Sequence, residues 1–127
     1  MTISPARPLG PEAQFQQFLA AGRFMLQRCR TSGRHVFYPR VAEPASGDED
    51  LEWVEAAGLG SVYSVTIVRP KPPEEAYVVA LVNLAEGPRM MTTVEGIAAT
   101  DVKIGMRVRA VIVNRGGRPM VVFEAND

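Results

Sequence analysis

The sequence predicts a mainly β protein, built around a five-stranded OB-type barrel or a small open sandwich and preceded by one helix and a hairpin. Five apolar runs rich in β-branched residues fill the second half of the chain, separated by turn-forming residues. One longer connection precedes the fourth run. This strand count and the mixed inward and outward alternation suit an OB-type barrel, although a sandwich satisfies the same pattern. The runs cover residues 60–69, 77–84, 89–95, 106–113 and 119–123.

Residues 1–22 are predicted to form a flexible arm followed by a helix. Pro11 suits the first position of a helix, and Gly22 suits its end. Three apolar side chains fall on one helical face, namely Phe15, Phe18 and Leu19. That face docks either on the body of the protein or on a partner, and the sequence supports both alternatives equally.

Residues 23–50 are predicted to form a ribbon-like hairpin. Two apolar runs, 24–29 and 34–38, flank a Ser-Gly turn, and Pro39 ends the second run. A loop follows that becomes acidic at its end. The remainder of the chain, residues 51–127, is assigned to the barrel, with a brief strand at 52–55 near its start.

Composition narrows the class of protein. The chain has 127 residues, 46% of them apolar, which fits one domain with its own core. The formal net charge is +0, so no global field draws the protein to nucleic acid or anionic lipid. The single cysteine, Cys29, fits a reducing compartment. No secretion signal or membrane-length apolar stretch is recognisable, so we expect a cytoplasmic protein.

Several segments occur in a characteristic order and spacing: Leu51-Glu-Trp-Val-Glu55, Gly58-Leu-Gly-Ser-Val-Tyr-Ser-Val-Thr66, Tyr77-Val-Val-Ala-Leu-Val82, Glu86-Gly-Pro-Arg89 and Ile104-Gly-Met106. Together they resemble the family of OB-fold proteins with an N-terminal rubredoxin-like zinc ribbon that is associated with acyl-CoA enzymes. The resemblance implies a helix, a ribbon and a C-terminal OB barrel. It also implies a non-catalytic accessory subunit that binds or shapes an acyl-CoA site for a thiolase-like or hydratase-like partner, with a homodimer as a further option.

The family's zinc site implies two Cys-x-x-Cys pairs in the ribbon. The corresponding positions here hold Cys29, Ser32, Glu43 and Ser46, so one thiol remains of four. Serine is a poor zinc ligand because its hydroxyl resists deprotonation. Adding His35, the only histidine, still gives a weak cage. We therefore expect a metal-free ribbon without a zinc cofactor, held together by apolar packing.

Basic and acidic residues are segregated along the ribbon. Five arginines lie in a stretch without an intervening acid, and an acidic cluster at 48–55 follows; the arginines are Arg23, Arg28, Arg30, Arg34 and Arg40. Because arginine suits bidentate contact with phosphate, one hypothesis is that they bind the phosphates of coenzyme A, with Phe37 and Trp53 stacking on its adenine. The alternative is that the two charge clusters neutralise each other and that the aromatic rings belong to the core.

Two other functions compete with the accessory-subunit hypothesis. OB barrels also bind single-stranded nucleic acid, but here aromatic residues make up only 7% of the chain and the net charge is zero. Cys29 and His35 could form a thiol nucleophile and its base. The resemblance assigns that cysteine to a former metal ligand position instead, so independent catalysis is not expected.

Overall fold

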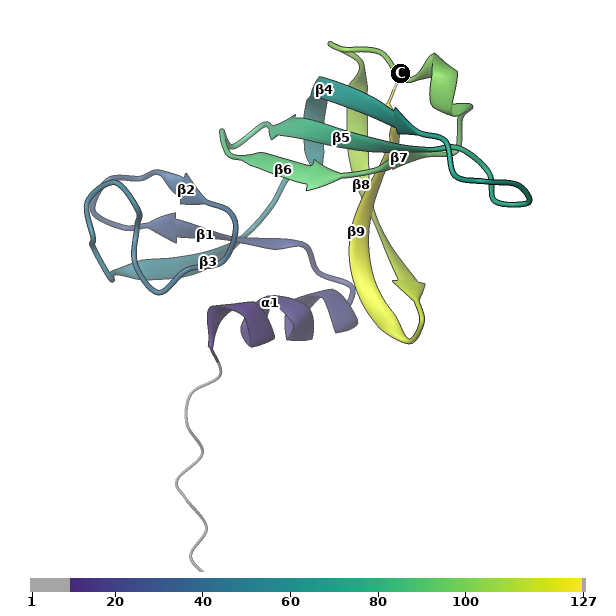
Figure 1. Cartoon of the computed structure of the whole chain (residues 1–127). Helices are drawn as coiled ribbons and strands as arrows, with labels where there is room; N and C mark the ends of the chain where they lie inside the picture. Colours follow the sequence, from purple (N-terminus) through teal and green to yellow (C-terminus); the bar gives the residue numbers. More distant parts are fainter. Residues whose placement is uncertain (1–9, 127) are drawn as a thin grey trace, which may run out of the picture.

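The computed structural model describes residues 10–126 and confirms the predicted class, a mainly β protein with one N-terminal helix (Figure 1). The expected arm at residues 1–9 lies outside the described residues. Helix α1 spans Pro11–Ala20, with proline at its start, and the chain turns away from it at Gly22, whose φ of 79° suits glycine. No helix in the described part of the chain is long and apolar enough to cross a bilayer.

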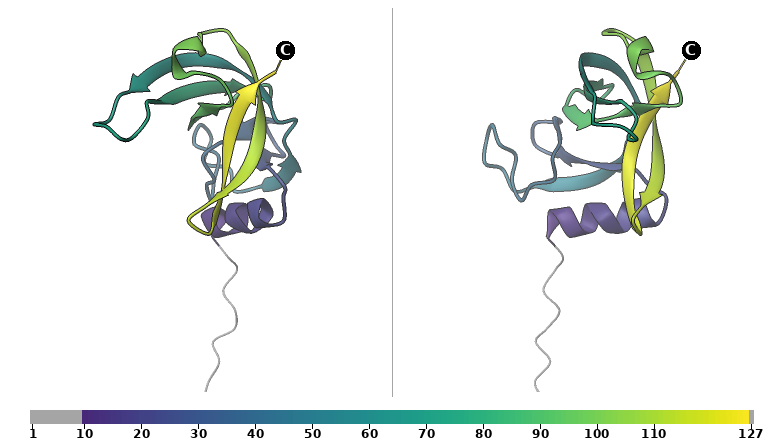
Figure 2. Two further views of the ribbon diagram at one scale, coloured as in Figure 1. Left: turned by 90° about the vertical axis from the view of Figure 1, so that its right-hand side faces the viewer. Right: turned by 45° about the vertical axis from the view of Figure 1, so that its right-hand side comes forward.

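The apolar face of α1 is used within the molecule. Phe15 and Leu19 are buried in the main core, and the ring of Phe18 lies 5.2 Å from that of Trp53, measured between centroids. The helix contacts the last strand of the barrel and the first strand of the ribbon, and both views in Figure 2 place it beside the end of the barrel. Of the two alternatives left open by the sequence, the structure shows intramolecular packing.

The ribbon is a three-stranded antiparallel sheet in the order β2-β1-β3. It consists of β1 (Met25–Cys29), β2 (His35–Val36) and β3 (Leu51–Glu55). The sequence assigned the third of these to the barrel, but it pairs with β1 along its whole length. The expected start of the barrel at residue 51 therefore does not match the strand pairing, and the barrel sheet begins with β4.

The barrel is a six-stranded sheet in the order β6-β5-β4-β8-β9-β7. Its strands are β4 (Leu59–Val68), β5 (Tyr77–Leu84), β6 (Arg89–Thr92), β7 (Val94–Glu95), β8 (Arg107–Arg115) and β9 (Arg118–Ala125). The third predicted strand is split at Thr93 into β6 and β7. The expected helical turn before the fourth strand is the short helix η1 (Ala99–Asp101).

The split strand gives the sheet its barrel shape. β6 pairs with β5 at one edge of the sheet, and β7 pairs in parallel with β9 at the other. The backbone N–H of Phe123 donates to the carbonyl oxygen of Thr93 at 3.0 Å, so the interruption itself is tied to β9. The sheet thus curls so that its two edge strands, β6 and β7, follow each other directly in the sequence, as in an OB fold.

One core joins the helix, the ribbon and the barrel. Phe123, Val82 and Val108 are fully buried inside the barrel, and Phe24 and Leu26 of the ribbon belong to the same cluster. Ala56 donates its N–H to the carbonyl oxygen of Phe24 at 2.9 Å, which anchors the connection between the two sheets. The ribbon therefore rests on the barrel through a shared apolar interior.

Candidate functional site

Two loops of the ribbon fold into the same turn. In the first, residues 29–34, the Gly33 N–H donates to the Cys29 carbonyl at 2.7 Å and the Cys29 N–H donates to the Arg34 carbonyl at 2.8 Å. In the second, residues 43–48, the equivalent bonds join Gly47 to Glu43 and Glu43 to Asp48, both at 2.7 Å. Both glycines have φ near 75°, at 75° and 74°. We call these turns the first and second knuckle.

The knuckles bring together the positions that the sequence identified as former metal ligands. Glu43, which is only 2% exposed, accepts hydrogen bonds from the hydroxyls of Ser32 and Ser46, each at 2.6 Å. Each serine hydroxyl also accepts a backbone N–H, from Arg34 and Asp48 respectively, at 3.2 Å. A serine at the fourth position of each knuckle thus links the turn to one shared carboxylate.

The guanidinium of Arg34 supplies the positive charge at this centre. Its Nη2 lies 2.8 Å from Oε1 of Glu43, and its Nε lies 3.1 Å from Oε2. Both carboxylate oxygens therefore have two hydrogen-bond donors each, which is what a buried carboxylate needs. Apolar packing alone was expected to hold the ribbon, but a hydrogen-bonded ion pair also connects its two knuckles.

The residues at this centre do not fit zinc. Both oxygens of Glu43 are occupied by its protein donors, and serine hydroxyls do not replace thiolates. Within residues 10–126, no three His, Cys, Asp or Glu side chains gather closely enough to hold a metal ion. The absence of zinc stays a prediction that elemental analysis of the purified protein will test.

The hydrogen-bonded centre makes stability depend on pH. The bonds from Arg34, Ser32 and Ser46 lower the pKa of Glu43 from its ordinary 4.5 to about 2. Because this pKa is depressed in the folded state, the stabilisation is complete above about pH 4.5 and is lost as pH falls through about 2.

We therefore expect the difference in unfolding free energy between wild type and Glu43→Gln to be constant near neutral pH and to shrink below pH 4.5. Urea unfolding of both proteins at several pH values measures this difference. The comparison cancels the titration of the other carboxyl groups. Two stability curves that stay parallel down to pH 2 would contradict the assignment.

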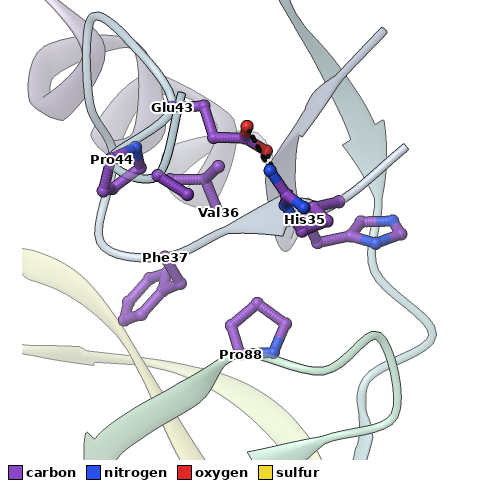
Figure 3. A pocket seen from close by; sticks show the side chains of 8 residues that line it. His35, Val36, Phe37, Glu43, Pro44 and Pro88 are labelled. Carbon is purple, nitrogen blue, oxygen red and sulfur yellow. Dashed lines mark hydrogen bonds and ion pairs between the residues drawn. The ribbon is translucent and has the colours of Figure 1, made fainter. Parts of the chain in front are cut away.

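A cleft lies between the ribbon and the barrel, next to the Glu43 centre. A cavity of about 280 Å³ is bordered by Val36, Phe37 and Pro44 from the ribbon and by Pro88 from the β5–β6 turn (Figure 3). A second cavity of about 390 Å³ includes Arg34, His35 and Glu86. Because clefts between structural units are common ligand sites, this is the best-formed small-molecule site of the ribbon.

The proposed coenzyme A contacts do not converge on this cleft as a group. Only Arg34 and Phe37 border it. Three of the other arginines form ion pairs with acids on or beside β3: Arg23 with Glu55, Arg28 with Glu52, and Arg30 with both Asp50 and Glu52. The backbone of Arg40 is held by the side chain of Gln27, whereas its guanidinium makes no ion pair within the described residues. The segregated charges thus face each other across neighbouring strands.

The two candidate stacking aromatics are partly buried and engaged. The ring of Phe37 lies 5.7 Å from that of Phe15 and 4.3 Å from that of Tyr38. Trp53 donates its Nε1–H to Oε1 of Gln14 at 2.5 Å and packs on Phe18. Both rings therefore fasten the helix to the ribbon, and only Phe37 of the two also lines the cleft.

The sequence analysis missed a second candidate surface, on the outside of the barrel. Three large apolar side chains with exposed fractions of 51%, 58% and 38% border one cavity of about 370 Å³: Tyr77, Met91 and Met120. The signal was present in the sequence, because the run 77–84 is apolar almost throughout instead of alternating with polar residues.

Comparison with known proteins relates this chain to one group of OB-fold proteins. A family model described as the C-terminal OB-fold domain of ChsH2 matches residues 53–113. A probable enoyl-CoA hydratase alpha subunit of Thermomonospora curvata is 44% identical over 90 residues, covering 68% of this chain and 28% of the relative. A DUF35 domain-containing scaffold protein of Pyrococcus furiosus is 28% identical over 109 residues, covering 83% of this chain and 79% of the relative.

Solved structures extend the similarity over the whole described fold. A structure named the Ltp2-ChsH2(DUF35) aldolase matches with a TM-score of 0.79 and 34% identity, over 96% of this chain and 98% of the other. A DUF35 protein of unknown function from Sulfolobus solfataricus matches with a TM-score of 0.66 and 19% identity, over 90% and 84% of the two chains. The second match supports the fold alone. The chain spans about a quarter of the length of the hydratase alpha subunits that it resembles.

Proposed function

Because the chain belongs to the DUF35 family of OB-fold proteins, we propose that it serves an acyl-CoA enzyme as a non-catalytic accessory subunit. The partner would be a thiolase-like or hydratase-like protein. Relatives named as a scaffold protein, as hydratase alpha subunits and as part of an aldolase support this role. Homology supports this class of partner, and under the proposal the chemistry belongs to that partner.

The single observation that carries the proposal is the match to the Ltp2-ChsH2(DUF35) aldolase. It covers nearly the whole of both chains at 34% identity, so the ribbon and the helix are shared as well as the barrel. The name of that structure joins two proteins in one aldolase. A chain with the same full-length architecture is therefore well suited to act beside a second subunit.

The position of the only cysteine supports a non-catalytic role. The Cys29 side chain is fully buried at the base of the first knuckle, whereas a nucleophile must reach its substrate. His35 lies on the neighbouring strand, where it is the Cα partner of Arg28. The pair therefore lacks the exposed arrangement that a thiol nucleophile and its base require.

The cleft beside Arg34 and Phe37 is our candidate for the acyl-CoA contact. Its lining is mostly apolar, with Arg34 and His35 as well as the carboxylates of Glu43 and Glu86 at its border. Its apolar part suits a flexible pantetheine arm, and Arg34 is the group that could meet a phosphate. The guanidinium of Arg34 is already hydrogen-bonded to Glu43, so a phosphate would have to share this guanidinium with the carboxylate. We expect the cleft to complete a site shared with the partner subunit.

Single-stranded nucleic acid is the alternative ligand of an OB barrel. Four of the five candidate arginines, Arg40 being the exception, are ion-paired with ribbon acids, which weakens a phosphate-tracking groove on this side. The alternative predicts binding whose affinity falls steeply with salt. A titration with single-stranded DNA at low and moderate salt tests it.

The proposed function predicts co-purification with an acyl-CoA enzyme. The tagged chain is isolated from its native cells at low salt, and the proteins that accompany it are identified by mass spectrometry. We expect a thiolase-like or acyl-CoA hydratase-like subunit in a fixed ratio to the chain. Recovery of the chain alone, or with enzymes of unrelated chemistry, would overturn the proposal.

A further inference from the structure

Strand β5 is apolar on both of its faces. Its inward side chains, Val78, Ala80, Val82 and Leu84, are all buried in the core. Three of its four outward positions carry Tyr77, Val79 and Leu81, and only the fourth, Asn83, is polar. An antiparallel sheet facing water usually carries polar residues at such positions. A strand that is apolar on both faces is typical of a sheet covered on both sides. The outer face of β5 is therefore built to be covered.

Neighbouring strands extend this outer face into a continuous surface. Val68 on β4 is the Cα partner of Tyr77, and Met91 on β6 is the Cα partner of Leu81, so each pair shares a face. Met120 on β9 borders the same cavity as Tyr77 and Met91. We define the apolar strip as these six residues: Val68, Tyr77, Val79, Leu81, Met91 and Met120.

The apolar strip is hollowed at one point. The cavity of about 370 Å³ is bordered by Tyr77, Val79, Met91 and Met120, and the ion pair of Glu95 and Arg115 also lines it. Its apolar bordering residues come from β5, β6 and β9. A concave centre surrounded by aromatic and methionine side chains is the usual environment of an interface hot spot, because it can enclose one anchoring side chain of a partner. Methionine also adapts its shape to different contacts.

Arginines outnumber acids beside the apolar strip, where Glu75 precedes Tyr77 by two residues. Arg89 lies two residues before Met91, where it donates to Asn83 at 2.8 Å and stacks 3.6 Å from the ring centroid of Tyr63. Arg118 lies two residues before Met120 on β9. Among the described residues neither arginine forms an ion pair, whereas Arg115 is neutralised by Glu95. The border of the strip therefore offers two arginines to a partner.

The charges beside the apolar strip indicate which kind of partner binds to it. A second copy of the chain, packed strip against strip, would bring its own arginines against the same positive border, and like charges across an interface cost binding energy. A partner with an apolar surface bordered by carboxylates has the complementary charge. We propose that the apolar strip is the surface on which the acyl-CoA enzyme subunit docks, through an apolar patch flanked by Asp or Glu. The inference rests on the proposed function for the identity of that subunit.

Site-specific cross-linking in the native cells tests the proposal. A photo-reactive amino acid is placed at Leu81 or Met91 within the strip, or at Ile104, which is 70% exposed and lies outside it. We expect Leu81 and Met91, but not Ile104, to cross-link to the acyl-CoA enzyme subunit. The cross-linked peptides of that subunit should contain apolar residues next to Asp or Glu.

The other outcomes separate the two hypotheses. Cross-links to the enzyme from position 104 and none from the strip would overturn the docking surface while the proposed function stands. Cross-links from the strip to a second copy of the chain would overturn the choice of partner. If no position yields an acyl-CoA enzyme, both the proposed function and this inference fail.

Substitution measures the strength of the contact. Met91→Asp should weaken the affinity for the recovered subunit at least tenfold, because a charge replaces an apolar contact at the centre of the interface. Ile104→Asp is the matched control and should leave the affinity unchanged. Arg89→Glu should slow association mainly at low salt, as expected for a border charge. Thermal melting verifies that each variant folds, and equal affinities for the first two variants would contradict the proposal.

Discussion

Converting Ser32, Glu43 and Ser46 to cysteine is expected to turn this chain into a zinc protein with one ion bound per molecule. The two knuckles already have matching backbone hydrogen bonds, and the native Cys29 supplies the fourth thiol. Ser32, Glu43 and Ser46 are in direct contact through hydrogen bonds of 2.6 Å, so three of the four ligand positions converge. Four thiolates at such a centre satisfy the tetrahedral preference of zinc.

The effect on stability should be large and depend on the metal. Binding to the folded state alone stabilises it by about 4 kcal/mol when free zinc exceeds the dissociation constant about a thousandfold. With a chelator, the same variant should be less stable than wild type, because Arg34 has lost the carboxylate that it bonds. Metal analysis, cobalt absorption and urea unfolding with and without zinc measure these effects.

The control variant keeps the carboxylate. Ser32→Cys combined with Ser46→Cys leaves Glu43 and Arg34 in place and supplies three thiols in total. We expect it to bind zinc more weakly than the triple variant, since the carboxylate must first leave the guanidinium. If the triple variant binds no stoichiometric zinc, or if zinc does not stabilise it, the knuckles do not have the geometry that we infer.

The elements that follow from local patterns were predicted well. The helix start at Pro11 and the five barrel runs are fixed by residue types within a few positions of each other, and the structure confirms them. The pairing of β3 with β1, in contrast, could not be predicted from local patterns. Its short run of residues 51–55 is compatible with either sheet, and the choice depends on contacts with β1, about 25 residues earlier in the chain. Local sequence holds no information about such a contact.

The contacts within the candidate site could likewise be predicted only in part from local sequence. The sequence marked Ser32, Glu43 and Ser46 as lost ligands, but not that they bond to one another. A usable signal was the repeat of Ser-Gly at the fourth and fifth positions of both knuckles, 32–33 and 46–47. The partner Arg34 could not be found in this way, because five arginines lie nearby and only the fold shows which one reaches Glu43. The sequence showed that basic and acidic residues are segregated along the ribbon, but it did not show that they pair between β1 and β3.

Gly60→Ala is expected to destabilise the barrel strongly. Gly60 lies within β4, near the start of the strand, as the predicted run 60–69 implied. A Cβ at this position would lie 2.6 Å from the carbonyl oxygen of Asn83 and 2.6 Å from Cγ1 of Val82, which is fully buried. The oxygen belongs to the backbone of the paired strand β5, so it cannot move without disturbing the sheet. Overpacking of this kind costs about 3 kcal/mol.

The matched control is Gly10→Ala, since a Cβ there meets nothing within 4 Å. Urea unfolding should show a much lower midpoint for the Gly60 variant and only a small change for the Gly10 variant, which alters the N-cap of α1. If the Gly60 variant also loses its enzyme partner while it remains folded at low temperature, the strain has spread along β5 to the apolar strip. Loss of stability with normal partner binding would instead confine the effect to the β4–β5 contact. An unchanged midpoint would show that the two strands can separate to admit a methyl group, contrary to the close approach described here.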